Sequence, residues 1–348
     1  MKKIAVEEHF LTEDYVAYLH SRKEFPKREI VEEDGQTFIR DWWSATNYRL
    51  MNPNQPNKDR ILDLGEGRLA QMDAAGIDMQ VLSLSFPGVE QFEASDATAM
   101  ARSVNDELYQ AVQQYPKRFS GLAAIAPQDP KAAAAELERA VNHLGFKGAM
   151  INGNIRGEYL DARKYWVIFE AAATLDVPVY IHPKMPSPDM IKPYLAYPGL
   201  ASAMWGFAAD AGLHAMRLMC SGVFDQYPGL KIILGHLGEA IPFWLWRIDS
   251  RWLEEKQSDI ASAEAYRHFQ KSPGQYFKDN FYVTTSGMCW EPALQFVCNV
   301  LGAEKILFAA DYPYESSREI AEFIDSVQLS EKDKEKICHA NAEKLLHL

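Results

Sequence analysis

Cysteine is scarce in this chain: there are four cysteines among 348 residues, and no two stand in a C-x-x-C spacing. This excludes a fold held together by a disulfide framework. We predict that all four are reduced thiols and that Cys289 and Cys298 fill the core. Reduced thiols indicate a cytoplasmic location.

Clusters of basic residues and long apolar runs are also missing. Lys and Arg total 36 against 48 Asp and Glu, which gives a formal net charge of −12 with no basic block for a phosphate backbone or an anionic membrane. No apolar run approaches the length of a membrane span, and the start MKKIAVEEHF is too short and too soon acidic for a signal peptide. We therefore expect neither a nucleic acid nor a membrane partner. A small anionic substrate stays possible, because a local cation can outweigh the overall charge.

The sequence does contain apolar runs of strand length, which alternate with longer helix-patterned stretches. One such stretch, 129–145, begins with an Asp cap and ends on Gly145. Strands that alternate with helices predict a parallel sheet, and eight such units predict an α/β fold of the (β/α)8 TIM-barrel type, with residues 1–348 as one catalytic domain. The predicted strands are 3–9, 78–85, 119–127, 146–153, 177–183, 230–236, 281–286 and 306–313.

Two segments do not fit this repeat. Residues of about 14–60 are aromatic and rich in Pro and Asn, and residues of about 184–210 contain KMPSPDMIKPYLAYPG. We predict long irregular loops inserted after the first and fifth strands, on the face where barrel enzymes carry their chemistry. The first insertion would be a lid or an oligomer interface, and its Trp42, Trp43 and Tyr48 suit either role.

Metal-type ligands stand at the ends of several predicted strands. Glu7 and His9 share one face of the first strand because side chains alternate, and Glu8 faces the other way in a predicted structural role. His182 ends the fifth strand and Asp311 the eighth, so a barrel would bring these ligands to one centre. Carboxylate and imidazole together suit zinc, manganese or iron. The alternative is a set of solvated strand ends and turn residues.

A further histidine follows the sixth strand in GHLGE, residues 235–239. Glu239 could orient the imidazole of His236, and a histidine held by a carboxylate is poised for acid–base work. A purely structural His–Glu pair is the alternative.

Taken together, these motifs resemble the amidohydrolase-related decarboxylases, which include γ-resorcylate, 2,3-dihydroxybenzoate and 5-carboxyvanillate decarboxylases. The likeness runs over nearly the whole chain and rests on E-x-H at 7–9, IHP at 181–183, GHLGE at 235–239, DYP at 311–313, RFSGLAAIAPQDP at 118–130 and SGVFDQYPGLKIILGH at 221–236.

The resemblance implies a carboxy-lyase with one divalent metal ion, zinc or manganese, and no organic cofactor. By motif position Glu7, His9, His182 and Asp311 would hold the metal. Arg247 matches an arginine that in relatives reaches the substrate of the neighbouring subunit, which implies a homodimer or homotetramer.

The chemistry expected on this basis is decarboxylation of a small ortho-hydroxylated aromatic carboxylate. Asp311 would protonate the ring carbon before CO2 leaves, which requires a raised pKa, and His236 with Glu239 would assist. The first alternative is a metal-dependent hydrolase of a lactone or amide on the same barrel, although hydrolytic relatives commonly carry H-x-H on the first strand. The second is an inactive binding module, which would be expected to have lost a ligand.

Overall fold

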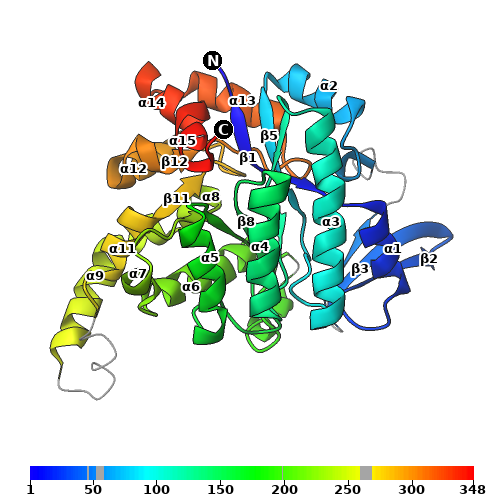
Figure 1. Cartoon of the computed structure of the whole chain (residues 1–348), viewed down its shortest axis with the longest axis horizontal. Coiled ribbons are helices and arrows are strands. Elements are labelled where there is room, and N and C mark those ends of the chain that lie inside the picture. Colours follow the sequence, from blue (N-terminus) through cyan, green and yellow to red (C-terminus); the bar gives the residue numbers. More distant parts are fainter. Residues whose placement is uncertain (45–46, 52–58, 198, 259–268) are drawn as a thin grey trace.

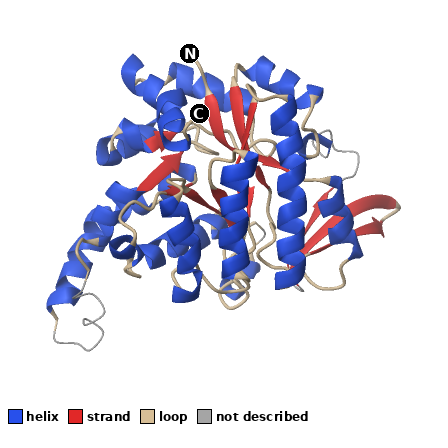
Figure 2. Ribbon diagram, viewed as in Figure 1, coloured by secondary structure: helices blue, strands red, loops and turns tan. Residues whose placement is uncertain are grey.

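The structure, a computed structural model, describes residues 1–44, 47–51, 59–197, 199–258 and 269–348. Parallel strands lie at its centre, and helices surround them (Figure 2). All eight predicted strands are found. The barrel strands are β1 (Ile4–Phe10), β5 (Met79–Leu84), β6 (Phe119–Gly121), β7 (Ala123–Ala124), β8 (Ala149–Asn152), β9 (Val179–His182), β10 (Ile232–Leu234), β11 (Phe281–Thr284) and β12 (Ile306–Leu307).

The barrel closes through short links between its strands. β6 and β7 act as one bent strand, since the amide of Leu122 donates to Leu82 of β5 and that of Ala123 donates to Gly148 before β8. Between β12 and β1, the amide of Val6 donates to Phe308 O at 3.0 Å and that of His9 donates to Tyr312 O at 2.8 Å. The first and last strands are therefore neighbours, and their C-terminal ends meet.

The strands read as nearly continuous apolar runs because both of their faces are buried. Alternate residues fill the inside of the barrel, among them Val6, Val81, Met150 and Ile233. The residues between them, such as Leu82 and Ile151, pack against the surrounding helices in a second, larger cluster. Polar residues on these strands are therefore exceptions that require partners.

Helices connect the strands and cover the outside of the barrel (Figure 1). The cap predicted for residues 129–145 is confirmed: Asp129 accepts from the amide of Ala132, and Gly145 ends the helix at φ 73°. The helices are α1 (Glu13–Ser21), α2 (Glu66–Ala75), α3 (Ala94–Gln114), α4 (Pro130–Leu144), α5 (Trp166–Thr174), α6 (Gly206–Met219), α7 (Val223–Gln226), α8 (His236–Glu239), α9 (Ile241–Gln257), α11 (Pro273–Asn280), α12 (Glu291–Leu301), α13 (Ser317–Ser326), α14 (Glu331–Glu335) and α15 (Asn341–Leu346).

The segment of about 14–60 differs from the irregular loop that we expected. It contains α1 and an antiparallel sheet of β2 (Lys27–Glu33), β3 (Gln36–Ser44) and β4 (Asn47–Met51), at the side of the barrel in Figure 1. The β2–β3 hairpin turns at Asp34 and Gly35, both at positive φ as a two-residue hairpin turn requires. The prediction failed because the mixed polar and apolar strands of this sheet lack long apolar runs. Residues 45–46 and 52–58 of this segment lie outside the described residues.

Two further findings concern the cysteines and the expected absence of a membrane span. All four cysteines are free; Cys338 is buried, but Cys289 is exposed, so its prediction as core is wrong. Cys289 lies in the turn before α12, where the chain runs over the surface. In the part of the chain that the structure describes, no helix has both the length and the apolarity that a membrane crossing needs.

Candidate metal centre and substrate cavity

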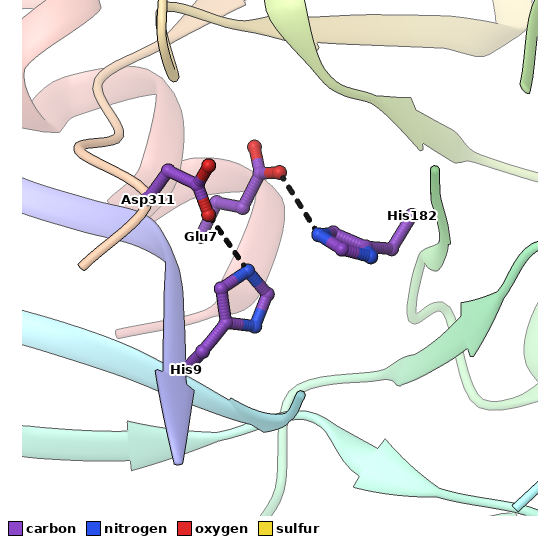
Figure 3. Close-up of side chains that lie close together, drawn as sticks. All are labelled: Glu7, His9, His182 and Asp311. Carbon is purple, nitrogen blue, oxygen red and sulfur yellow. Dashed lines mark ion pairs between the residues drawn. The ribbon is translucent and has the colours of Figure 1, made fainter. Parts of the chain in front are cut away.

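Four side chains from three barrel strands converge at the C-terminal end of the barrel (Figure 3). Glu7 and His9 lie on β1, His182 is the last residue of β9, and Asp311 follows β12. Each offers one ligand atom, and these atoms all lie within 4.8 Å of one another. Nε2 of His9 is 3.0 Å from Oδ1 of Asp311, and Nε2 of His182 is 3.6 Å from Oε1 of Glu7. The structure thus brings together all four predicted ligands.

The donor set fits a divalent cation. Among the described residues, Oε1 of Glu7, Nε2 of His9 and Oδ1 of Asp311 are buried without a hydrogen-bond partner. Leaving such atoms unpaired in a buried site costs free energy, and a cation between them removes that cost. Two imidazoles with two carboxylates are ligands that zinc and manganese accept.

A second layer of side chains holds Glu7 in place. Its Oε2 accepts hydrogen bonds from the hydroxyl of Tyr180 and, at 2.9 Å, from Oγ1 of Thr284. Burial and then the Glu7 carboxylate raise the pKa of Tyr180 well above its ordinary value, so its hydroxyl stays a donor. These two bonds leave Oε1 of Glu7 to face the other ligands.

Sequence reasoning missed Tyr180 and Thr284. The sequence does contain a signal for Tyr180, because it precedes His182 by two residues and therefore lies on the same side of the strand. Nothing local marked Thr284, because its partner lies at the other end of the chain.

His236 and Glu239 form the predicted pair, with Nδ1 of His236 2.8 Å from Oε1 of Glu239. They lie on α8, an irregular turn in which His236, Leu237 and Glu239 all have positive φ. Burial opposes the charged imidazole, but the carboxylates of Glu239, Glu7 and Asp311 outweigh it and raise the pKa of His236 to about 10. The Glu239 carboxylate, in direct contact with Nδ1, therefore favours the charged form of the imidazole.

The two groups beside His236 are shifted in ways that suit proton transfer and ligation. Burial raises the pKa of the Asp311 carboxyl, although His9 opposes the shift. Burial also lowers the pKa of His182 well below its ordinary value, and His9 and His236 add to this effect. Neutral imidazole is the form of histidine that ligates metals.

A cavity of about 600 Å³ adjoins the ligand cluster, and two of the four ligands, His182 and Asp311, line it. Its wall is largely aromatic, and the ring of Phe86 lies 5.8 Å from Trp43, 5.7 Å from Phe207 and 5.8 Å from Tyr314. Both segments that interrupt the repeat contribute to it: Trp43 and Tyr48 come from the sheet β2–β4, and Tyr194, Leu195 and Tyr197 come from the stretch after β9. His182, His236 and Asp311 form its floor.

Arg247 does not line the cavity of the chain to which it belongs. It is exposed on α9 and lines a separate hollow of about 460 Å³ with Trp205 and Trp244. The expectation that it reaches a substrate therefore depends on a neighbouring subunit.

A family model described as amidohydrolase matches residues 9–348. The chain belongs to the amidohydrolase family. The γ-resorcylate decarboxylase of Polaromonas sp. is 36% identical over 355 residues, covering 99% of this chain and 98% of the relative. The resemblance drawn from the motifs is confirmed.

Solved structures agree along the full length of this amidohydrolase. The 5-carboxyvanillate decarboxylase of Novosphingobium aromaticivorans, complexed with manganese and 4-hydroxy-3-methoxy-5-nitrobenzoic acid, has a TM-score of 0.88 and 36% identity, and the match covers 100% of this chain and 96% of that one. A dihydroxybenzoic acid decarboxylase of Polaromonas sp., with bound manganese and the inhibitor 2-nitroresorcinol, has a TM-score of 0.83 and 36% identity, with 100% and 97% covered. Both of these full-length homologues are decarboxylases of aromatic acids with bound manganese.

Proposed function

We propose that this protein is a metal-dependent, non-oxidative and reversible decarboxylase of an ortho-hydroxylated aromatic carboxylic acid. The observation that carries the proposal is the arrangement of Asp311 and the His236–Glu239 pair on the floor of an aromatic cavity, directly at the four-ligand centre. The full-length homology to hydroxybenzoate decarboxylases supports it.

Glu7, His9, His182 and Asp311 would hold one divalent ion, manganese or zinc, and no organic cofactor is needed. When bound, the ion would supply a Lewis acid for the carboxylate and hydroxyl oxygens of the substrate. Phe86, Trp43 and Phe207 would hold the ring by aromatic contact, which fixes the reacting carbon over the floor of the cavity.

Asp311 is proposed to deliver the proton. Direct loss of CO2 would leave an unstabilised aryl carbanion, so the ring carbon that bears the carboxylate is protonated first. The bond to CO2 then breaks, and its electron pair restores the aromatic ring. Asp311 regains a proton from solvent. Burial and the neighbouring anionic substrate would favour the protonated carboxyl, against the charge of the bound ion.

His236 is proposed to stabilise the negative charge on the hydroxyl oxygen of the substrate. Glu239 holds the imidazole by a 2.8 Å contact to Nδ1, which leaves Nε2 for the cavity.

We further propose a homodimer or homotetramer in which Arg247 reaches the substrate of the partner. Next to Arg247, α9 exposes Phe243, Trp244 and Trp246, with 71%, 50% and 78% of each residue accessible. Large exposed apolar patches of this kind mark protein interfaces. Residues 1–348 would form one catalytic domain, with the sheet β2–β4 covering the cavity as a lid or joining the interface.

The test is a panel of hydroxybenzoates given to the protein loaded with MnCl2 or ZnCl2. Ring absorbance and released CO2 are followed, and bicarbonate with the phenol is supplied for the reverse direction. Turnover of ortho-hydroxybenzoates alone is expected. Inactivity over the panel with hydrolysis of a lactone or amide would replace the proposal by the hydrolase alternative, and metal analysis of the purified protein would distinguish manganese from zinc.

A further inference from the structure

Glu8 lies between two metal-ligand candidates in sequence, yet its side chain takes no part in their cluster. It is fully buried and faces away from Glu7 and His9. Its Oε1 accepts from the amide of Ala310 at 2.8 Å, and its Oε2 accepts from the amide of Tyr312 at 3.2 Å. The carboxyl group of Glu8 thus binds the backbone amides of the residues on both sides of Asp311.

The backbone of Asp311 needs such support. Asp311 has φ 64°, in the left-handed region that L-residues other than glycine rarely adopt, at a cost of about 1–3 kcal/mol when held there. The regular pairing of β12 ends at Leu307, and beyond it single backbone bonds to β1 hold the segment around Asp311. Its own amide donates to Glu7 O at 2.9 Å, and the two flanking amides are the ones that Glu8 binds.

The carboxylate of Glu8 is itself anchored by a buried cation. Gln80 joins the two groups, donating from Nε2 to Oε2 of Glu8 at 3.2 Å and accepting at Oε1 from Nη1 of Arg68 at 3.2 Å. The guanidinium of Arg68 is fully buried and also donates to His9 O at 2.7 Å. It lies 4.7 Å from the ring of Tyr312. Arg68 therefore contacts the backbone of one candidate ligand and the neighbour of another.

We propose that Glu8, backed by Arg68 through Gln80, is a positioning residue that sets the carboxylate of Asp311 at the metal centre. The side-chain hydrogen bonds of Glu8 add to the sparse backbone pairing at the seam between β1 and the end of β12. A shift of the seam would move Oδ1 of Asp311 away from its position 3.0 Å from Nε2 of His9. The proposal rests on the metal centre of the proposed function and not on the identity of the substrate.

The test is a double-mutant cycle on manganese affinity. Glu8→Gln keeps the shape of the side chain but turns one acceptor into a donor that faces an amide N–H. MnCl2 is titrated, and free Mn²⁺ is measured by electron paramagnetic resonance in wild type, Glu8→Gln, Asp311→Ala and the double variant. Glu8→Gln is expected to weaken binding about 10–100-fold in the wild-type background and hardly at all in the Asp311→Ala background, in which residue 311 has no ligand atom to position.

Glu136→Gln is the matched control. Glu136 is another buried carboxylate, on α4, bound by Asn105 and Arg139 away from the centre. It should leave manganese affinity unchanged. Glu8→Asp keeps the carboxyl group but moves its oxygens away from the two backbone amides. It should show a loss in the same direction, and it serves if Glu8→Gln does not fold.

Unchanged affinity in the folded Glu8 variants, or an equal loss with and without Asp311, would overturn the proposal. Wild-type protein that binds Mn²⁺ with this pattern but turns over no hydroxybenzoate would instead contradict the proposed function and leave the positioning role of Glu8 standing.

Discussion

Nε2 of His9 and Oδ1 of Asp311 lie 3.0 Å apart, although the two residues come from opposite ends of the chain. Within the described structure neither atom has a hydrogen-bond partner, so both are available to a shared third group. Their closeness is a consequence of barrel closure, in which β1 pairs with the segment that follows β12. The metal centre and the seam of the barrel are thus one structural feature.

Asp311→Asn should separate metal binding from chemistry. Three candidate ligands remain, and an amide oxygen can still coordinate, so Mn²⁺ should bind measurably. The amide cannot donate the proton, and turnover of ortho-hydroxybenzoates should fall by about 10³-fold or more. Free Mn²⁺ by paramagnetic resonance and CO2 release would be measured. Asp325→Asn, on α13, is the control, and an Asp311→Asn rate near that of wild type would contradict the role in proton transfer.

Glu239→Gln should shift the pH profile of kcat. The Glu239 carboxylate, in contact with the ring, raises the pKa of His236, so the imidazole keeps its charge to a higher pH with Glu239 than without it. Without the Glu239 carboxylate, less negative charge offsets the lowering of the His236 pKa by burial. The imidazolium therefore deprotonates at a lower pH. The decline of kcat on the basic side should therefore begin at a lower pH than in wild type. Glu343→Gln, which removes the partner of His339 near the C-terminus, should leave the profile in place.

Tyr180→Phe should weaken metal binding without removing a ligand. It deletes one of the two hydroxyls that hold Oε2 of Glu7 and leaves Thr284 as the other. The expected loss of Mn²⁺ affinity is about tenfold, at the lower end for residues that orient ligands. Isothermal titration calorimetry would measure it. Tyr165→Phe, which loses a hydroxyl bond to Glu158 on the outside of the barrel, should show no change.

His214 should make stability depend on pH in the acid range. Burial, and then the charges of Arg217 and Lys184, lower the pKa of His214 to about 3, and its Nε2 accepts from the amide of Leu160. Between pH 6.5 and 3 the unfolded chain binds a proton that the folded protein does not. The free energy of unfolding should therefore fall by up to about 1.4 kcal/mol per pH unit as the pH drops through this window.

His214→Gln lacks this titration, so its free energy of unfolding should depend less steeply on pH. Urea unfolding at pH 7, 6, 5 and 4 would compare the slopes. His339→Gln serves as the control, and equal slopes for wild type and His214→Gln would refute the assignment.

Trp246→Glu should dissociate the proposed oligomer. It places a charge in the exposed aromatic patch on α9, and the mass by light scattering should fall to that of one chain. Arg247→Ala should keep the assembly and raise KM for the substrate, because it removes only the proposed contact between Arg247 and the substrate of the partner subunit. Leu348→Glu alters an exposed apolar side chain beyond α15, away from α9 and the sheet β2–β4, as a control. A wild-type protein that is already monomeric would refute the oligomer.

The barrel was predictable because its signals are local. Each strand is a short apolar run, and the helices between them carry their own caps, as Asp129 and Gly145 show. The antiparallel sheet β2–β4 was not foreseen, since its strands mix polar and apolar residues and depend on pairing for their definition.

The sequence by itself determined which residues could be ligands, because the alternation of a strand places Glu7 and His9 on one side and Glu8 on the other. It also determined that His236 has a carboxylate three positions away. Only the tertiary structure decided how these groups are supported. The bonds from Tyr180 and Thr284 to Glu7, and from Glu8 to the backbone around Asp311, join residues far apart in the chain. Such contacts follow from barrel closure and strand register, which no local pattern encodes.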